Sequence, residues 1–311
     1  MSAAILPPRG VVARVPAKVN LELRVGPRRA DGFHALSTVY HAVDLTDEIT
    51  VESAEEWGVT VLGPYAGRVP TDESNLAMRA ARAVAALADV DEPVHITIDK
   101  SIPVAGGMAG GSADAAGTLL ACDSLWQTDL SRSDLEEAAA ELGSDVPFLL
   151  TGGTAIGSGR GEQVVPVLTQ GTFHWVFALH HSGLSTADVY AECDRLRADE
   201  DVPVPEPSGE LMTALRAGDV DQLASALMND LEPAACSLDS TLRKTMAAGL
   251  THGALATTVS GSGPTVAFLA RDKAAALDLM VSLSADGVAD DVVHARGPAA
   301  GAHILNDITV R

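Results

Sequence analysis

Lysine is scarce in this sequence of 311 residues and occurs only at positions 18, 100, 244 and 273. Lys and Arg together number 21 against 42 Asp and Glu, which gives a formal net charge of −21. A protein that binds nucleic acid through its phosphates needs clustered basic residues to release counterions, and an anionic membrane surface makes the same demand. The composition therefore argues against both partners. A small anionic substrate stays possible if positive side chains at one site outweigh the negative charge around them. Each lysine is therefore a candidate residue of such a site.

Cysteine is also rare, and the three residues present (Cys122, Cys193 and Cys236) lie far apart with no CxxC motif. This spacing argues against a disulfide framework and against a zinc site, so we expect a reducing cytoplasm and no protein-held metal. The sequence lacks an uninterrupted apolar stretch of about 18 residues, which predicts no membrane-spanning helix. Its first residues, MSAAILPPRG, lack the apolar run of a signal peptide.

Aromatic residues make up only 4% of the chain, so the core that its 47% hydrophobic content predicts must consist largely of Ala, Val and Leu. The length predicts two domains. Alternating or glycine-flanked apolar runs predict strands, and runs of strong helix formers predict helices. The predicted strands are 11–63 in several pieces, 93–99, 174–180, 254–270 as a pair around a glycine turn, and 291–295. The predicted helices are 76–89, 113–126, 131–142, 186–198, others up to 249, and 272–285. Strands and helices do not alternate strictly, which favours an α+β fold in each half, with an exposed acidic loop at 199–209.

A glycine-rich segment at 105–111 lies between a predicted strand and a buried helix. The start of a helix leaves backbone N–H groups without partners and carries partial positive charge, and glycines let a phosphate approach those groups. A tight turn that only lets the helix pack is the alternative. The segment has no Gly-Lys pair of a P-loop, and Met108 interrupts the GxGxxG spacing of dinucleotide-binding loops. A phosphate site here would belong to another class.

Lys18 and Asp145 each allow two interpretations. The alternation of the first strand places Lys18 with Asn20 on the face opposite Val19, and a solvated face is the simpler explanation. Asp145 precedes Val-Pro at a predicted helix start, where Asp is a favoured cap, but beside the apolar VPFLL segment it could also be a partly buried base near a cation. The segments at 31–34 and 261–265 could be plain turns.

Taken together and in order, five segments resemble motifs of the GHMP small-molecule kinases. The segments are PAKVNLELRV, RRADGFHAL, IPVAGGMAGGSADAA, GSDVPFLLTGGTAIGSGRGE and SGSGPTVAF. The resemblance extends from about residue 13 to 296. Within the family, PAKVNL, RADGFH and GSDVPF are most similar to the kinases that act on a cytidyl-diphosphate sugar alcohol.

The resemblance implies an α+β GHMP kinase fold, with an N-terminal domain like domain 2 of ribosomal protein S5 and a ferredoxin-like C-terminal domain. We expect residues 1–165 to form the ATP-binding, catalytic domain and residues 166–311 to complete the substrate cleft. The implied reaction is ATP- and Mg²⁺-dependent phosphorylation of the C2 hydroxyl of 4-diphosphocytidyl-2-C-methyl-D-erythritol in non-mevalonate isoprenoid biosynthesis. A kinase for another small alcohol, of the homoserine or mevalonate type, and a non-catalytic nucleotide-binding relative are the alternatives. We expect a monomer or weak homodimer.

The resemblance also implies roles for individual residues. Asp145 matches the catalytic base and Lys18 the lysine beside it. The implied substrate-binding residues are Asn20, Phe33, His34, Tyr190, Gly261, Ser262 and Gly263, with Phe33, His34 and Tyr190 holding the cytosine. The implied ATP-binding residues are Asn75, Leu76, Pro103, Val104, Ala105, Gly106, Gly107, Met108, Ala109, Gly110, Gly111, Ser112 and Ala113.

Four residues depart from the family pattern. Phe33 stands where tyrosine is more usual and loses its hydroxyl. Met108, Ala109 and Ala113 stand where Leu, Gly and Ser are common. The Cβ of Ala109 matters only if that residue requires a positive φ.

Overall fold

Two β-sheets form the framework of the chain. The computed structural model describes residues 9–104, 106–181 and 183–309. Its strands are β1 (Arg9–Arg28), β2 (His34–Ser53), β3 (Gly58–Leu62), β4 (Val94–Asp99), β5 (Thr154–Ser158), β6 (Gln163–Pro166), β7 (Phe173–Leu179), β8 (Met228–Asn229), β9 (Ala256–Val259), β10 (Val266–Ala270), β11 (Asp291–Gly297) and β12 (His303–Thr309). Its helices are η1 (Ala66–Arg68), α1 (Leu76–Leu87), α2 (Gly110–Trp126), α3 (Arg132–Leu142), α4 (Val146–Thr151), α5 (Thr186–Leu196), α6 (Gly209–Ala217), α7 (Val220–Ala226), α8 (Glu232–Leu238), α9 (Thr241–Thr251) and α10 (Lys273–Asp286).

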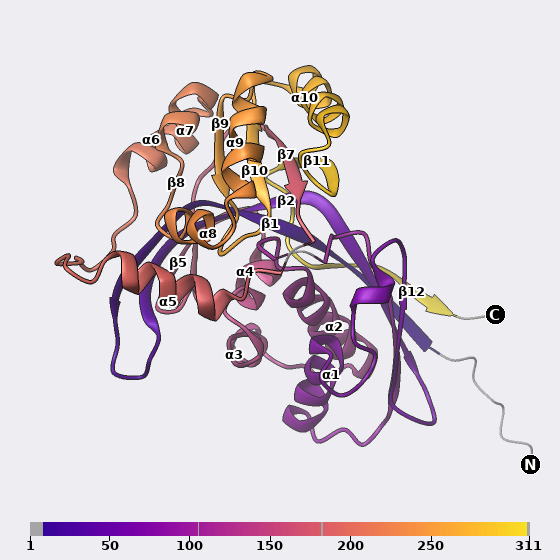
Figure 1. Ribbon diagram of the computed structural model, residues 1–311. Helices are drawn as coiled ribbons and strands as arrows, with labels where there is room; N and C mark the ends of the chain where they lie inside the picture. Colours follow the sequence, from indigo (N-terminus) through magenta and orange to yellow (C-terminus); the bar gives the residue numbers. More distant parts are fainter. Residues whose placement is uncertain (1–8, 105, 182, 310–311) are drawn as a thin grey trace, which may run out of the picture.

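The first sheet has the order β12-β1-β2-β4-β3, with β5 and β6 continuing from β2 and β8 paired with β1. β1 and β2 are long antiparallel strands that cross the whole molecule (Figure 1). Helix α2 is apolar on nearly all sides, as the sequence predicts, because it packs against β1 and β2 on one side and against α1 and α3 on the other. The start of α2 is thereby fixed next to the sheet.

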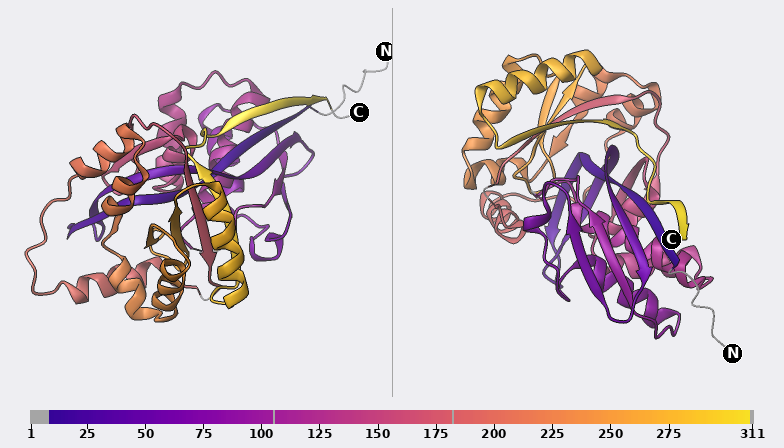
Figure 2. Two further views of the ribbon diagram at one scale, coloured as in Figure 1. Left: turned by 90° about the horizontal axis from the view of Figure 1, so that it is seen from above. Right: turned by 90° about the vertical axis from the view of Figure 1, so that its right-hand side faces the viewer.

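The second sheet has the order β11-β7-β10-β9, in which all neighbours are antiparallel. Helices α9 and α10 cover one face, as Figure 2 shows for the orange and yellow part of the chain. Side chains of β7 alternate between two cores: Trp175 and Phe177 join the core around the first sheet, and Val176 and Ala178 join the core beneath α9 and α10. The predicted α+β class and ferredoxin-like C-terminal topology are confirmed.

The last strand, β12, returns to the first sheet and pairs antiparallel with β1. No strand was predicted after residue 295, and this pairing places the end of the chain on the sheet of the first half. The division at 165/166 stays a prediction. Elsewhere the predicted strands and helices are present, with α2 beginning at Gly110, three residues earlier than expected. In the described part of the chain, no helix is long and apolar enough to span a membrane.

The polar face of β1 is buried, and the simpler interpretation of a solvated face is wrong. Lys18 and Asn20 are 3% exposed and Glu22 is 0% exposed. The C-terminal half covers them: the Ser208 amide donates to Glu22, and the turn at Gly261 lies against Lys18. Alternation assigns residues to faces, but it does not reveal what covers a polar face.

Candidate active site

Lys18 and Asp145 meet in a cleft of about 700 Å³. The Lys18 Nζ and an Asp145 carboxylate oxygen are 3.6 Å apart, and the side chains are 4% and 29% exposed. Lys18 lies in the middle of β1, and Asp145 is the residue immediately before α4. The Asp145 side chain makes no cap hydrogen bond to α4, so the capping interpretation does not explain its position. Its carboxylate faces the cleft instead.

A chain of hydrogen bonds orients Lys18. The Lys18 ammonium donates to Asn20 Oδ1 at 2.7 Å, and the Asn20 amide donates to the Thr38 hydroxyl at 2.8 Å. Thr38 in turn donates to the carbonyl of Glu22 at 2.7 Å. The ammonium has three N–H donors, so this bond and the looser approach to Asp145 leave it able to contact a ligand in the cleft.

Tyr40 closes the floor of the cleft beneath the pair. Its ring centroid is 5.8 Å from Lys18 Nζ, and the ring stacks on Phe148 of α4 at 4.8 Å. Burial, and then the neighbouring Asp145 carboxylate, raise the pKa of the Tyr40 hydroxyl well above its ordinary value. Tyr40 therefore stays neutral, and its hydroxyl is a hydrogen-bond donor to the Asp145 carboxylate.

The glycine-rich loop before α2 lies directly across from Lys18 and Asp145. Helix α2 begins without a side-chain cap at Ala109, so the amides of its first turn have no partner from such a cap. Gly107, Ala109 and Ser112 line the cleft. Free amides at a helix N-terminus attract anions, so this loop can hold a phosphate next to the carboxylate.

The glycines at 106 and 107 are required by contact with the turn at 260–264. A Cβ at Gly106 would lie 2.0 Å from the carbonyl oxygen of Gly263, and one at Gly107, where φ is +101°, would lie 2.2 Å from that of Ser260. The hydroxyl of Ser260 donates to Gly107 at 2.9 Å, and that of Thr265 donates to Gly106 at 2.8 Å. Two glycine-rich segments that are far apart in the sequence therefore pack directly against each other.

Ala109 adopts φ +59°, in the left-handed region. The Cβ that replaces the usual glycine hydrogen therefore matters, at a cost of about 1–2 kcal/mol for an L-residue in this conformation. Met108 and Ala113, the other two departures in the loop, have side chains buried in the first core. Both can offer a ligand only their backbone.

The opposite side of the loop borders a second hollow of about 370 Å³. Five of the residues predicted to bind ATP line it, namely Pro103, Val104, Gly106, Gly110 and Gly111. Asn75 caps α1 by accepting from the Ala77 amide at 2.8 Å, and it donates to the carbonyl of Pro70, a residue of the hollow, at 2.6 Å. Leu76 approaches Gly111. Ala105 lies outside the described residues.

Another part of the large cleft is aromatic. The rings of His34 and Tyr190 stack with centroids 5.1 Å apart, and His34 Nε2 lies 2.8 Å from an Asp194 carboxylate oxygen. Phe33 is 53% exposed, and the Arg160 guanidinium lies over its ring at 5.3 Å. Burial and the Asp145 charge raise the pKa of Tyr190, so it remains a neutral stacking surface. A flat base could lie against these rings.

Gly261 and Ser262 also line this cleft, whereas Gly263 contacts the glycine loop from behind. Sequence reasoning missed several other residues of the cleft. They are Arg28, Tyr40, Ser144, Arg160, Thr186 and Asp194. Arg160 lies inside the segment GSDVPFLLTGGTAIGSGRGE, and Thr186 lies four residues before Tyr190, but neither was assigned a role. The Thr186 hydroxyl is 2.9 Å from that of Ser262.

Comparison with known proteins identifies the family. Residues 75–153 match the model of the GHMP kinases N terminal domain, and residues 211–289 match that of the GHMP kinases C terminal. The chain is 54% identical to the 4-diphosphocytidyl-2-C-methyl-D-erythritol kinase of Mycolicibacterium gilvum, over 96% of this chain and 94% of the relative.

Solved structures agree. A crystal structure of a 4-(cytidine 5'-diphospho)-2C-methyl-D-erythritol kinase superposes with a TM-score of 0.76 at 30% identity, covering 93% of this chain and all of the other. The homoserine kinase of Cytophaga hutchinsonii shares the fold at a TM-score of 0.70 and 19% identity, covering 98% of this chain and 99% of its own. From the matched family models and the relatives, the chain belongs to the GHMP kinase family.

Proposed function

We propose that this protein is an ATP-dependent kinase that phosphorylates the C2 hydroxyl of 4-diphosphocytidyl-2-C-methyl-D-erythritol. The observation that carries the proposal is that one cleft holds both the Lys18–Asp145 pair and the His34–Tyr190 stack. The first suits a hydroxyl that is to be phosphorylated, and the second suits a pyrimidine. A relative 54% identical to this chain carries the corresponding name.

Asp145 acts as the general base in this proposal. It accepts the proton of the substrate hydroxyl while the oxygen attacks the γ-phosphorus of ATP, and the bond to the β-phosphate oxygen breaks. Lys18, 3.6 Å away, pairs with this carboxylate and faces the charge that develops on the transferred phosphoryl group. The amides of the loop before α2 hold the remaining phosphate oxygens.

Magnesium would accompany the nucleotide. The groups that face the cleft beside the loop are oxygen donors, the Asp145 carboxylate and the hydroxyls of Ser112 and Ser144, which suit a hard cation. Among the described residues no three His, Cys, Asp or Glu side chains form a metal-binding group, so phosphate oxygens would supply the other ligands. The ion would offset charge on the transferring phosphates.

Basic side chains surround the cleft although the chain is strongly acidic. Lys18, Arg28 and Arg160 line it together with two carboxylates, Asp145 and Asp194, so basic groups exceed acidic ones by one where an anionic diphosphate substrate would bind. The three cysteines are free and buried, so we place the reaction in a reducing cytoplasm. A monomer or weak homodimer stays our prediction for the assembled state.

A coupled ADP-release assay tests the function directly. With ATP, Mg²⁺ and the cytidyl substrate we expect turnover, and ³¹P NMR of the product should show a new phosphomonoester on a tertiary carbon. Homoserine and mevalonate are the comparison substrates. Turnover with either of them alone would favour the alternative of a kinase for another alcohol. Nucleotide binding without turnover of any of the three would favour a non-catalytic relative.

A further inference from the structure

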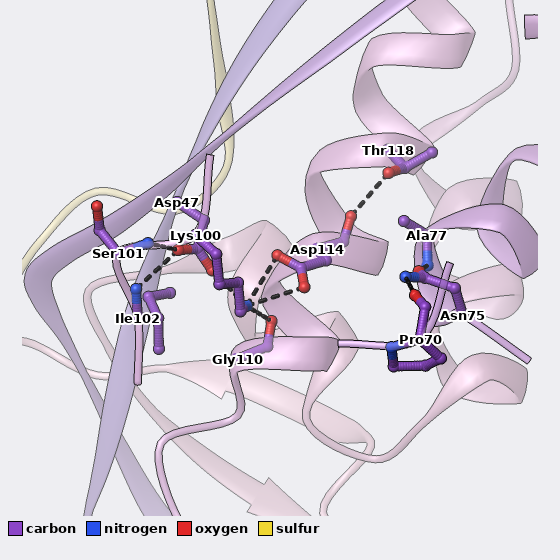
Figure 3. A network of polar contacts seen from close by, with 10 residues as sticks. All are labelled: Asp47, Pro70, Asn75, Ala77, Lys100, Ser101, Ile102, Gly110, Asp114 and Thr118. Carbon is purple, nitrogen blue, oxygen red and sulfur yellow. Dashed lines mark hydrogen bonds and ion pairs between the residues drawn. The ribbon is translucent and has the colours of Figure 1, made fainter. Parts of the chain in front are cut away.

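Lys100 is buried beneath the glycine loop, on the side away from Lys18. It is 1% exposed, and its partners Asp47 and Asp114 are 0% and 2% exposed. The ammonium donates to Asp47 at 2.6 Å, to both oxygens of Asp114 at 2.8 and 3.0 Å, and to the carbonyl of Gly110 at 2.9 Å. Figure 3 shows it pointing between the two carboxylates and toward the first turn of α2.

The same cluster contacts both ends of the loop. Asp47 comes from β2 and uses its other oxygen to accept from the amides of Ser101 and Ile102, each at 2.7 Å. Lys100 contacts the chain again where α2 begins, at Gly110 and Asp114. The described residues of the loop, 103–104 and 106–109, therefore lie between two points that one ionic cluster fixes to the sheet.

The Lys100 ammonium has no N–H donor left for a ligand. An ammonium has three donors, and all three are directed at protein oxygens. Lys100 and Asp114 border the smaller hollow, yet a ligand could bind the ammonium only by breaking a buried ion pair. The geometry fits a role that acts through the loop rather than by contact with the reacting groups.

The loop needs such support. It contains glycines at 106, 107, 110 and 111, and glycine loses more conformational freedom on ordering than any other residue. No side chain caps α2, so its first amides are available to a phosphate only while the backbone stays in place. Donors that are already ordered bind and stabilise charge better than donors that must be ordered by the ligand.

We propose that Asp47, Lys100 and Asp114 are positioning residues that hold the loop ready for the ATP phosphates. This inference rests on the proposed function, because it takes the loop to be the phosphate site. The cluster fixes Ser101 and Ile102 at one end and the start of α2 at the other. Its effect falls on ATP and leaves the cytidyl pocket unchanged.

Asp114→Asn is the variant that tests the proposal. The amide keeps one acceptor for Lys100, removes the second, and leaves the Lys100–Asp47 pair intact. We expect the Kd of ATP, measured by calorimetry without the second substrate, and the KM for ATP to rise about tenfold, the scale of one charge-assisted hydrogen bond. The KM for the cytidyl substrate should change less than twofold and kcat less than about threefold. Asp123→Asn is the matched control, because Asp123 lies on the same helix and bonds Thr128 instead.

Amide hydrogen exchange, measured in the unmodified protein and in Asp114→Asn, provides a second test. Without nucleotide, the amides of Ser101 and Ile102 should exchange slowly, and in Asp114→Asn exchange over 101–113 should accelerate relative to the rest of the chain. Fast exchange of those two amides in the wild type would overturn the proposal. So would a change in the ATP constants no larger than that of Asp123→Asn, or an equal rise in both KM values. A wild type that binds no ATP would instead overturn the proposed function, and the exchange result would still stand by itself.

Discussion

Two of the four lysines are buried on opposite sides of one loop, and they differ in how fully their ammonium groups are paired. Lys100 sits 2.6 and 2.8 Å from two carboxylates and donates to a backbone carbonyl as well. Lys18 has one close acceptor, Asn20, and a carboxylate at 3.6 Å that is still 29% exposed. The two ammonium groups are thus similarly buried but differ in how many of their N–H donors are paired. The fully paired ammonium of Lys100 stabilises the fold, whereas the ammonium of Lys18 has N–H donors left to bind a substrate.

The carboxylates differ in the same way. Asp47 accepts three hydrogen bonds. Burial and the nearby Asp47 charge raise the pKa of Asp114 above its ordinary value, although the Lys100 ammonium opposes the shift. Asp145 makes no cap bond and faces an open cleft. A base must be able to exchange its proton with a ligand, so only Asp145 has the access that the reaction demands. The comparison predicts which substitutions change turnover and which change stability.

The largest effect should come from Asp145→Asn. Loss of the base should lower kcat by about 10²–10⁴-fold, while both KM values and the melting temperature stay close to wild type, because the side chain is 29% exposed, caps no helix, and as Asn keeps an oxygen that accepts from Tyr40. Steady-state kinetics with the cytidyl substrate measures the loss. The control is Asp188→Asn, an exposed carboxylate on the neighbouring α5. Turnover within a few-fold of wild type would remove Asp145 from its role as base.

The two lysines can be compared with the same replacement. Lys18→Met should lower kcat by about 10²–10³-fold through lost stabilisation of developing charge. Its free energy of unfolding should fall by only about 1 kcal/mol, the worth of the bond to Asn20, since Asp145 stays solvated. Lys100→Met leaves two buried carboxylates without a cation, so its free energy of unfolding should fall by about 3–5 kcal/mol. Urea unfolding of both variants gives the two values. Equal losses of stability would contradict the distinction between them.

The sequence predicted this comparison only in part. It singled out the glycine loop, Lys18 and Asp145, and motif order brought the last two into one site. It did not assign Lys100, because its partners at 47 and 114 come from other elements and only the fold brings them together. Local spacing cannot show a contact of that kind. The αL conformation of Ala109 and the fit of Gly106 against Gly263 are likewise tertiary facts.

The return of β12 to β1 escaped prediction for a similar reason. A short final strand carries a weak alternation signal of its own, and its pairing is decided by the open edge of β1. The fold class was easier to predict, because long apolar patterns in β1, β2 and α2 each determine a type of element. Burial of the polar face of β1 was harder to predict, because polar residues are found both in a buried cleft and on a solvent-exposed face.

The smallest expected effect lies at the aromatic end of the cleft, distant in role from both lysines. Tyr190→Ala should raise the KM for the cytidyl substrate about 2–12-fold, which corresponds to the roughly 0.5–1.5 kcal/mol of one aromatic contact. The KM for ATP and the stability of the Lys100 cluster should not change, because Tyr190 contacts neither. Tyr190→Phe is the matched control, since it keeps the ring that stacks on His34 and should behave like the wild type within about twofold. A selective rise in the KM for ATP would instead place the adenine, rather than the cytosine, against Tyr190. The nucleotide would then bind in the large cleft and the cytidyl substrate in the smaller hollow on the other side of the glycine loop. In that arrangement Asp145 would not face the hydroxyl that accepts the phosphate.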